Sequence, residues 1–437
     1  MTTKMRILII TLLMCCSLIT KAQNDTLEVS MNQAMAYATE FGYQSINART
    51  DIEIAKRKVR ETLAIGLPQV NASGFLNSNL RIQENQIQFG DTTTIRTKFG
   101  TKLNSSIGGR VDQLLFDGSY LVGLQASKVY VQLSENAKQK TDIQIKEAVA
   151  NAYFLVLLAR ANIDEFKANY EVINKTLKDT KIYYENGLVE ETDVDQVRLM
   201  EIETRRLYSN AQRQLEIAMA VLKFSMGVDI DNGIRLSDKI SDILLTIPND
   251  PSSTTNIQSH IDYRILATQI DIQGLDIKNQ KAQAMPKLNA FANYDYSWFG
   301  DEFSQLVNTD AAAIGVSLNI PIFSSGMRSS QLKQKKLELK KLEVDRQMLE
   351  QDLRMTVLVA STNLSNAKEE FESAIESKNI SSKIYDKSLI KFKNGLLNSL
   401  DLSQVEGRKV EAIINASRAA STYFDNYIIY QKATSQL

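Results

Sequence analysis

Cysteine and histidine are nearly absent from this 437-residue sequence. Its two cysteines, Cys15 and Cys16, lie in the first 22 residues, and His260 is its single histidine. The rest of the chain therefore has no disulfide bonds or thiol chemistry, and one histidine makes no metal-ligand cluster. Phosphate-binding loops, nucleophile elbows and zinc-ligand spacings are also missing. We expect no enzyme, no cofactor and no metal site.

The sequence also has no excess of positive or of negative residues. Lysine and arginine together number 51, as do aspartate and glutamate, so the net charge is zero. The charge-rich stretch 333–346 mixes both signs, which is typical of the solvated face of a coiled coil. The charge balance therefore predicts no nucleic-acid partner.

Proline is scarce, and its five positions are Pro68, Pro248, Pro251, Pro286 and Pro321. Because proline breaks helix interiors, the two long proline-free segments leave room for very long helices. Spacings of three and four in these segments predict coiled-coil seams. The seam residues are Ala148, Ala152, Leu155, Ala159, Asn162, Phe166, Tyr170, Ile173 and Leu177, then Leu339, Leu342, Arg346, Leu349, Leu353, Val357, Ala360, Leu364, Ala367, Phe371 and Ala374. A helix over 116–185 would be about 105 Å long.

The N-terminus has the pattern of an export signal. Lys4 and Arg6 precede an apolar stretch, and Ala22 is a small residue at the expected cleavage site. We expect residues 1–22 to be a signal peptide. An uncleaved anchor helix and lipid attachment at Cys15 or Cys16 are the alternatives.

One turn occurs twice in the chain, at a constant offset of 208 residues. "YENGLVEETDVDQV" begins at Tyr184 and "KFKNGLLNSLDLSQV" at Lys391. In each turn a glycine can end one helix in the left-handed conformation. Candidate N-caps of the returning helices are Thr192 and Asp193, then Ser399 and Asp401. The pattern predicts two helical hairpins, each with a tip.

Four segments alternate apolar and polar residues with period two, over 68–82, 102–115, 287–298 and 314–322. This alternation is typical of strands with one apolar and one polar face, and each run could cross a bilayer. Soluble hairpins are the alternative. We favour the membrane because the polar faces suit a wet lumen. Tyr294, Tyr296 and Trp298 are the candidate membrane-interface aromatics.

The duplicated features predict two tandem repeats. Repeat 1 covers 23–227, with a helix, a hairpin at about 68–116, a long helix, a tip at about 186–193 and a returning helix. Repeat 2 covers 259–437, with its hairpin at about 286–323 and its tip at about 394–401. Residues 228–258 form the expected linker, and 83–99 the expected longer external loop.

This ordered set resembles the TolC family of outer-membrane efflux channels. The resemblance rests on "LEVSMNQAMAYATEFG", the proline-led strands, the "LLFDGS" and "PIFSSG" junctions and both "NGL…D" tips, and it covers the chain after the signal. It implies an α+β membrane protein in which a homotrimer builds a 12-stranded β-barrel, with four strands from each chain. A long coiled-coil α-helical barrel would continue it as a periplasmic tunnel, from the outer membrane of a Gram-negative bacterium.

The resemblance also implies roles for residues at the tips. Asp401 matches aspartates that ring the closed periplasmic entrance, Asp193 is the first tip's candidate, and Gln404 stands where a second aspartate is often found. Phe392 and Leu397 replace the Tyr and Arg that lock the best-known member closed. A helix cap alone is the alternative role for Asp401. Candidate adaptor-docking residues are Gly187, Leu188, Val189, Thr192, Gly395, Leu396 and Leu397.

The expected function is a passive exit channel of a tripartite efflux system. Its partners would be two further copies, a periplasmic adaptor (membrane fusion) protein, an inner-membrane pump driven by protons or ATP, and outer-membrane lipid. The alternatives are a conduit for type I protein secretion and, with less support, a trimeric periplasmic scaffold or adhesin without a pore.

Overall fold

The computed structural model describes residues 27–437 except 90–92, 99, 250 and 252–255. The predicted signal peptide at 1–22 lies outside the described residues. The chain divides into two compact units. The helical unit comprises residues up to 49, 137–263 and 349–437, and the strand-bearing unit comprises 50–136 and 264–348.

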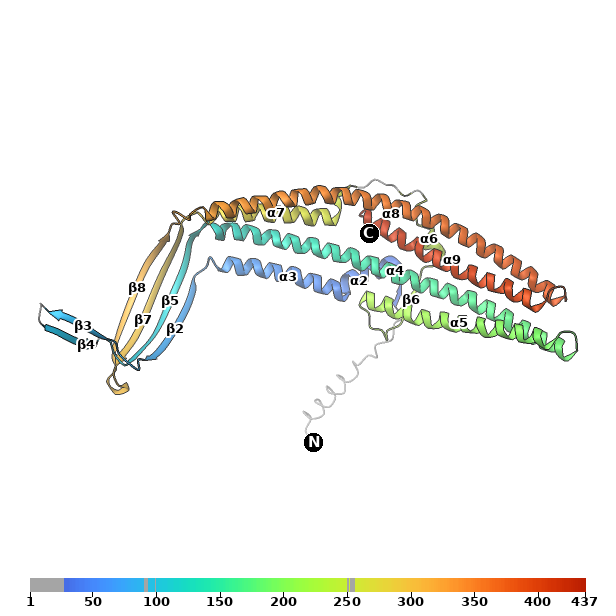
Figure 1. Cartoon of the computed structure of the whole chain (residues 1–437), viewed down its shortest axis with the longest axis horizontal. Coiled ribbons are helices and arrows are strands. Elements are labelled where there is room, and N and C mark those ends of the chain that lie inside the picture. The colour runs from blue at the N-terminus through green and yellow to red at the C-terminus, as the bar shows by residue number, and fades with distance from the viewer. Residues whose placement is uncertain (1–26, 90–92, 99, 250, 252–255) are drawn as a thin grey trace, which may run out of the picture. The chain divides into compact units, whose positions relative to one another are not determined.

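Four long antiparallel strands form the sheet of the strand-bearing unit (Figure 1). They are β2 (Gln69–Ser78), β5 (Leu103–Asp117), β7 (Lys287–Gly300) and β8 (Val307–Asn319), in the order β2-β5-β7-β8. The short helix η2 (Phe303–Gln305) lies between β7 and β8. Strands are therefore present in all four segments that alternate, although β8 begins before 314 and ends before 322. Since β2 and β8 lie at the two sides of this sheet, each leaves one edge without a partner strand in it.

The segment expected to be a loop over 83–99 is structured, so that expectation is wrong for its described residues. Strand β3 (Glu84–Phe89) pairs with β4 (Thr93–Lys98) as a separate two-stranded sheet. Ile87 lies opposite Ile95 in the backbone register of this hairpin.

Helices complete the strand-bearing unit. They are most of α3 (Tyr43–Ala64), the first part of α4 (Gly118–Glu185), most of α7 (Ile261–Ala282) and the first part of α8 (Met327–Lys393). The Asn136 amide donates to the Thr268 hydroxyl over 3.0 Å, joining α4 to α7. Gln273 on α7 donates to the Lys335 carbonyl on α8 over 2.9 Å.

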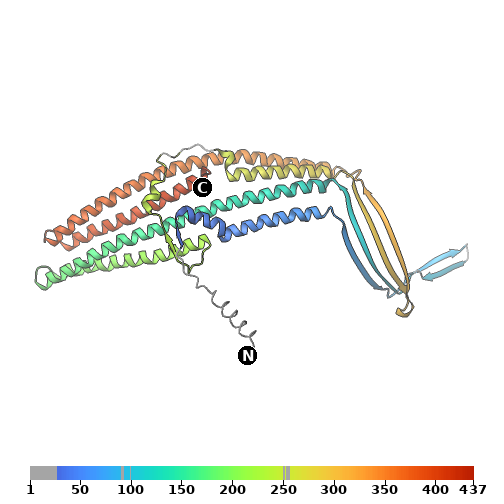
Figure 2. The same ribbon diagram turned by 180° about the vertical axis from the view of Figure 1, so that it is seen from behind.

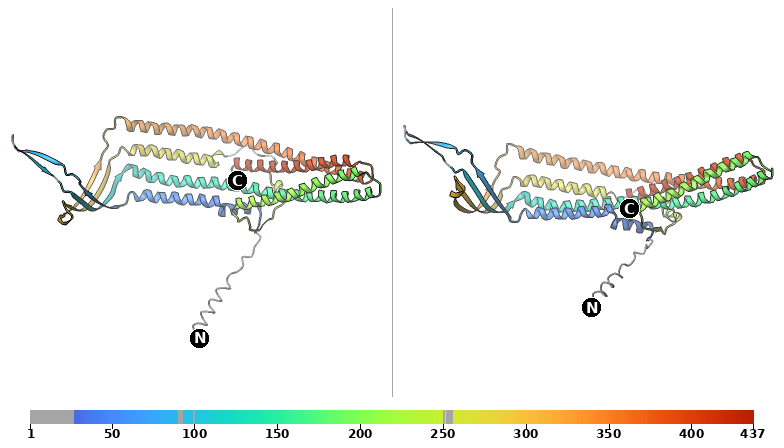
Figure 3. Two further views of the ribbon diagram at one scale, coloured as in Figure 1. Left: turned by 60° about the horizontal axis from the view of Figure 1, so that its bottom comes forward. Right: turned by 90° about the horizontal axis from the view of Figure 1, so that it is seen from below.

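The helical unit contains the antiparallel pairs α4 with α5 (Glu191–Met226) and α8 with α9 (Ser399–Ala433) (Figures 2 and 3). Helix α2 (Met31–Phe41) belongs to the same unit. Its core includes the rings of Phe154 and Phe424, stacked with centroids 4.1 Å apart. Apolar burial of this kind supplies most of the stability of such long helices.

The segment expected to be a linker, 228–258, is folded in its described part. Strand β6 (Ile234–Leu236) pairs in parallel with β1 (Leu27–Val29), and α6 (Ile240–Leu245) and η1 (Ile257–Ser259) follow. Ile234, Leu236 and Ile243 are buried in the main core. This segment is therefore part of the packed helical unit.

The two predicted seams differ in outcome. In α8 the seam residues from Leu353 to Ala367 are buried. In α4, Leu155 is 45% exposed and Ala148 is exposed, whereas Val149 and Val156 are fully buried. The seam expected in α4 is thus wrong at these two positions. Helix α4 contributes to a core shared with α2, α5, α6, α8, α9 and the β1–β6 pair, so its buried face is broader than a two-helix seam.

No helix within the described ranges combines the length and hydropathy needed to cross a membrane.

Candidate functional site

Both tips are built by the same backbone geometry. At the first tip, Gly187 has φ 74° and its N–H donates to the Tyr184 carbonyl, while Leu188 N–H donates to the Tyr183 carbonyl, both over 2.9 Å. This pair of bonds is the Schellman motif, which satisfies carbonyls left open at a helix end. The predicted glycine caps are confirmed.

The second tip repeats this arrangement. Gly395 has φ 71° and donates to the Phe392 carbonyl over 3.0 Å, and Leu396 N–H donates to the Lys391 carbonyl over 2.8 Å. The repeated Asn-Gly-Leu sequence therefore encodes the same helix end twice.

The predicted N-caps of the returning helices are wrong. Glu190 caps α5, and Asn398 caps α9 by accepting the Asp401 N–H at its side-chain oxygen over 2.7 Å. Both true caps directly precede their helices, so the four predicted residues lie inside the first turn instead. Ser399 is the first residue of α9, Thr192 is the second of α5, and Asp193 and Asp401 are each the third.

Asp193 holds the start of α5 and also contacts the other tip. One oxygen of its carboxylate accepts the Glu190 N–H over 3.2 Å, and the other accepts the Ser399 hydroxyl over 2.6 Å. The sequence offset pairs Asp193 with Asp401, so nothing in the repeat predicts a bond from Ser399. This bond links the two hairpin tips within one chain.

The three predicted entrance residues fall into two groups. Asp401 and Gln404 are exposed and three residues apart on α9, hence on one side of the helix. Asp193 is half-buried by its two hydrogen bonds. Of these three predicted residues, Asp401 and Gln404 therefore have the side chains most accessible to other molecules.

The predicted docking leucines also differ in exposure. Leu188 is 71% and Leu396 is 76% exposed, which is unusual for large apolar side chains at a turn. Leu397 instead packs with Phe392 against a small core. The members of that core are Ile173, Met200, Tyr385 and Leu402. The apolar tip surface is therefore made chiefly by Leu188 and Leu396.

A buried polar network, which the sequence did not reveal, joins α4, α8 and α9. The Asn169 amide donates to the Glu406 carboxylate over 2.9 Å, and Lys409 donates to the Asn169 oxygen over 3.0 Å. The Lys409 ammonium lies 4.2 Å from the centre of the Tyr385 ring. The Tyr385 hydroxyl is buried with no hydrogen-bond partner among the described residues.

Burial is the largest cause of the pKa shifts in this network. It raises the pKa of Glu406, against the Asn169 hydrogen bond and the Lys409 charge, which lower it. Burial lowers the pKa of Lys409 and raises that of Tyr385. Each shift favours the neutral form, as expected for groups removed from water.

The sheet β2-β5-β7-β8 has two chemically different faces. We call the face carrying Asp295 the polar face, because its register partners are mostly Asn, Ser, Gly and charged residues. The opposite, apolar face carries exposed Val70, Leu76, Ile314 and Val316. The candidate interface aromatics Tyr294, Tyr296 and Trp298 lie on this apolar face, and the last two rings meet edge to face at 4.8 Å.

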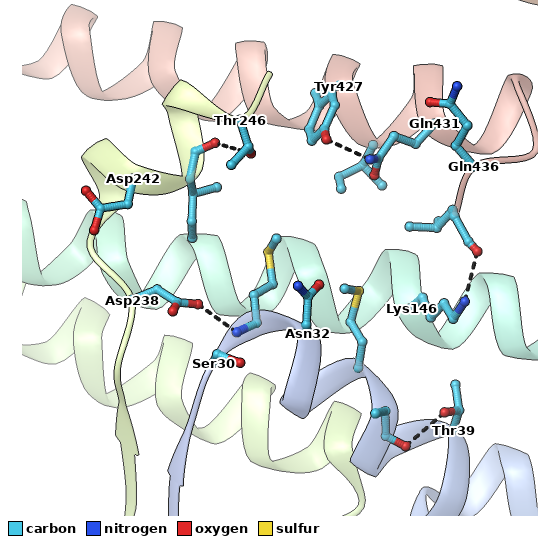
Figure 4. A pocket seen from close by; sticks show the side chains of 16 residues that line it. Ser30, Asn32, Thr39, Lys146, Asp238, Asp242, Thr246, Tyr427, Gln431 and Gln436 are labelled. Carbon is cyan, nitrogen blue, oxygen red and sulfur yellow. Dashed lines mark hydrogen bonds between the residues drawn. The ribbon is translucent and has the colours of Figure 1, made fainter. Parts of the chain in front are cut away.

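A cavity of about 690 Å³ lies between α2, α6 and the end of α9 (Figure 4). Several of its polar groups bond to one another. Asp238 accepts the Met31 N–H over 2.7 Å, Lys146 donates to the Leu437 carbonyl over 2.9 Å, and Gln431 donates to the Tyr427 hydroxyl over 2.6 Å. These bonds hold local structure together and do not form a catalytic set.

His260 likewise has a structural contact, since its Nδ1 accepts the Asp262 N–H over 3.3 Å. Across the part of the chain that the structure describes, no group of three His, Cys, Asp or Glu side chains could hold a metal ion.

Comparison with known proteins gives one consistent family. A model of the "Outer membrane efflux protein" family matches residues 46–228 and 264–427. The outer membrane efflux protein BepC of Brucella suis biovar 1 (strain 1330) is 24% identical over 281 residues, 61% of this chain and 58% of the relative. That match spans less than two thirds of the relative's length.

Solved channels share the fold, as a largely helical chain with some sheet. CusC superposes with a TM-score of 0.70 at 17% identity, over 96% of this chain and 95% of its own. The outer-membrane channel CmeC of Campylobacter jejuni gives 0.69 at 17% identity, over 93% and 85%. Since the family model matches most of the chain, the protein belongs to the outer membrane efflux protein family, the TolC-like channels of the outer membrane.

Proposed function

We propose that three copies of this chain form a 12-stranded barrel in the outer membrane that serves as a passive exit channel. The observation that carries this proposal is the sheet with an exposed apolar face and two unpaired edges. Its strands have 10, 15, 14 and 13 residues, and a tilted strand needs about 9–11 to cross a bilayer. In lipid an open edge is too costly to persist, so β8 of each copy would pair with β2 of the next.

The helical unit would continue the channel into the periplasm, with the two tips at the entrance. Residues 23–227 and 259–437 would be tandem repeats, 228–258 would connect them, and 1–22 would be the export signal. Asp401 and Gln404 would line the entrance, and the half-buried Asp193 would lie at the entrance as well, less exposed than these two residues. Tyr294, Tyr296 and Trp298 would lie at the lipid interface.

The exposed tip leucines support docking of a periplasmic adaptor, which would couple the channel to an inner-membrane pump. Energy would come from that pump, and the chain itself would catalyse no reaction. The same conduit could serve a protein-secretion system, because the pump selects what is delivered. A scaffold without a pore is less well supported, since it leaves the exposed apolar sheet face unexplained.

Cysteine cross-linking of the sheet edges tests the assembly. The chain has no cysteine after residue 16, so Asn71→Cys on β2 can be combined with a cysteine at Ala311, Ala313 or Gly315 on β8. Within one chain, two strands separate β2 from β8, which is roughly 14 Å and beyond disulfide reach. We expect disulfide-linked products ending at three chains. Monomers across the whole scan, or ladders longer than three, would contradict the proposal.

A further inference from the structure

The polar face of the sheet carries unequal numbers of positive and negative groups. All residues of its four strands are described, and the charged ones on this face are Arg110, Asp112, Asp117, Lys287 and Asp295. Three carboxylates therefore share the face with two basic groups, and one negative charge remains per chain.

Ion pairs identify which carboxylate remains. Lys287 contacts Asp117 over 3.0 Å, and Arg110 contacts Asp112 over 2.9 Å through more than one nitrogen. Both basic groups are thus held by other aspartates. Asp295 has no ion pair within 4.0 Å among the described residues. Arg110 also interacts electrostatically with Asp295, but its direct contacts are to Asp112, so Asp295 is the carboxylate of this face that lacks a basic group in direct contact.

The Asp295 carboxylate is held in place by its neighbours. Asn293 donates to one of its oxygens over 2.7 Å. The other oxygen lies over Gly108, the residue opposite Asp295 on β5, where an added Cβ would come within 2.0 Å of it. Any larger residue at position 108 would therefore push the carboxylate aside. This fixed position makes Asp295 a better electrostatic element than a freely rotating surface side chain.

We propose that Asp295 is a charge-selectivity residue of the channel, which makes the lumen favour cationic over anionic permeants at the level of the membrane. The inference rests on the proposed function, in which the polar face lines the lumen and three copies of Asp295 surround it. Charges of one sign in a conduit with low-dielectric walls raise the local concentration of the opposite ion. This element is separate from Asp401, which lies at a helix tip in the other unit.

The sheet offers a matched control. Asp310 on β8 is the single charged residue of the apolar face in these four strands, and it lies opposite Tyr296. Asp310→Asn removes the same charge as Asp295→Asn, from the same sheet but from the other face. Arg110→Gln makes the polar face more negative by one charge, because it removes a positive group and leaves Asp112 unpaired.

The experiment is the reversal potential of the full-length trimer in a planar bilayer under a potassium chloride gradient at low salt. Asp295→Asn should lower the ratio of cation to anion permeability by about twofold or more near 0.01 M, where the screening length is about 30 Å, with little effect near 1 M. Gly108→Ala should lower it less, Arg110→Gln should raise it, and Asp310→Asn should leave it unchanged.

This experiment distinguishes failure of the Asp295 proposal from failure of the proposed channel function. A normal conductance with unchanged selectivity in Asp295→Asn, or an equal change in Asp310→Asn, would overturn the role of Asp295 and leave the channel intact. Absence of conductance in the inserted wild type would instead overturn the proposed function.

Discussion

Ser399, the first residue of α9, donates a hydrogen bond of 2.6 Å to Asp193 in the first turn of α5. The two residues are 206 positions apart, and each belongs to a different hairpin tip. A hydrogen bond to a carboxylate is stronger than one between neutral groups. This bond therefore holds the two tips of one chain together.

Removing that hydroxyl should loosen the tips. We expect Ser399→Ala to weaken their association by about 1.5 kcal/mol, the lower end of the range for a hydrogen bond to a charged group. Amide hydrogen exchange over 188–193 should become about tenfold faster at this energy. Ser403→Ala, on the same helix, is the control. Unchanged exchange in Ser399→Ala would show that the bond contributes nothing to tip stability.

Alanine at the tip glycines tests the Schellman geometry. Gly187 and Gly395 have φ 74° and 71°, and an added Cβ would meet nothing within 4 Å, so only the backbone opposes it. Each alanine variant should cost about 1 kcal/mol in the free energy of unfolding, measured by denaturant titration.

Gly407 is the matched control, because it lies inside α9 with equally open space around it. Gly407→Ala should stabilise the protein by about 0.5–1 kcal/mol. Equal effects at all three glycines would refute the left-handed tips.

The buried Glu406 predicts a pH dependence of stability. Burial raises its pKa in the folded state above the ordinary carboxyl value of 4.5. At pH values between the ordinary pKa of the unfolded chain and the raised pKa of the folded chain, Glu406 keeps its proton in the folded state but has lost it in the unfolded state. The free energy of unfolding should therefore fall as pH rises through this window.

Glu406→Gln should flatten that slope, because the amide can replace the neutral carboxyl without titrating. Glu411→Gln, at an exposed position of the same helix, controls for the loss of one carboxylate. The measurement is thermal unfolding of the two variants and wild type from pH 4.5 upward. A slope retained in Glu406→Gln would assign the dependence to another group.

The exposed leucines predict where an adaptor binds. Replacing Leu188 and Leu396 with aspartate should abolish cross-linking to the adaptor from cysteine probes at the exposed positions Glu185 and Lys393, without unfolding the trimer. Leu397→Asp is expected to act differently, since Leu397 packs on a core and its loss should destabilise the tip itself. Full cross-linking in the Leu188 and Leu396 double variant would exclude this docking surface.

Elements with a local signal were predictable from the sequence. Alternation at every second residue identified the four strands, and the Asn-Gly-Leu repeat identified both helix ends, because these depend on neighbouring residues alone. The family resemblance followed from their order. The predicted N-caps were wrong because several polar residues at each tip could cap the returning helix, and the true caps, Glu190 and Asn398, each directly precede the helix.

Contacts between distant segments were not predictable. The Ser399–Asp193 bond, the Asn169–Glu406–Lys409 network and the Asp295–Gly108 contact each join residues far apart in the chain. Their partners depend on helix packing and strand register, which no local pattern specifies. The prediction of the buried face of α4 was wrong at Ala148 and Leu155 for the same reason, because several elements share the core against which α4 packs.

The most direct test of the central claim is the conductance of the purified protein in a planar lipid bilayer, wild type beside Asp401→Ala. A membrane pore that narrows at the exposed α9 tip predicts small, flickering currents in wild type and larger, steadier currents in the variant. Absence of current from protein shown to be inserted in the bilayer would contradict the channel itself.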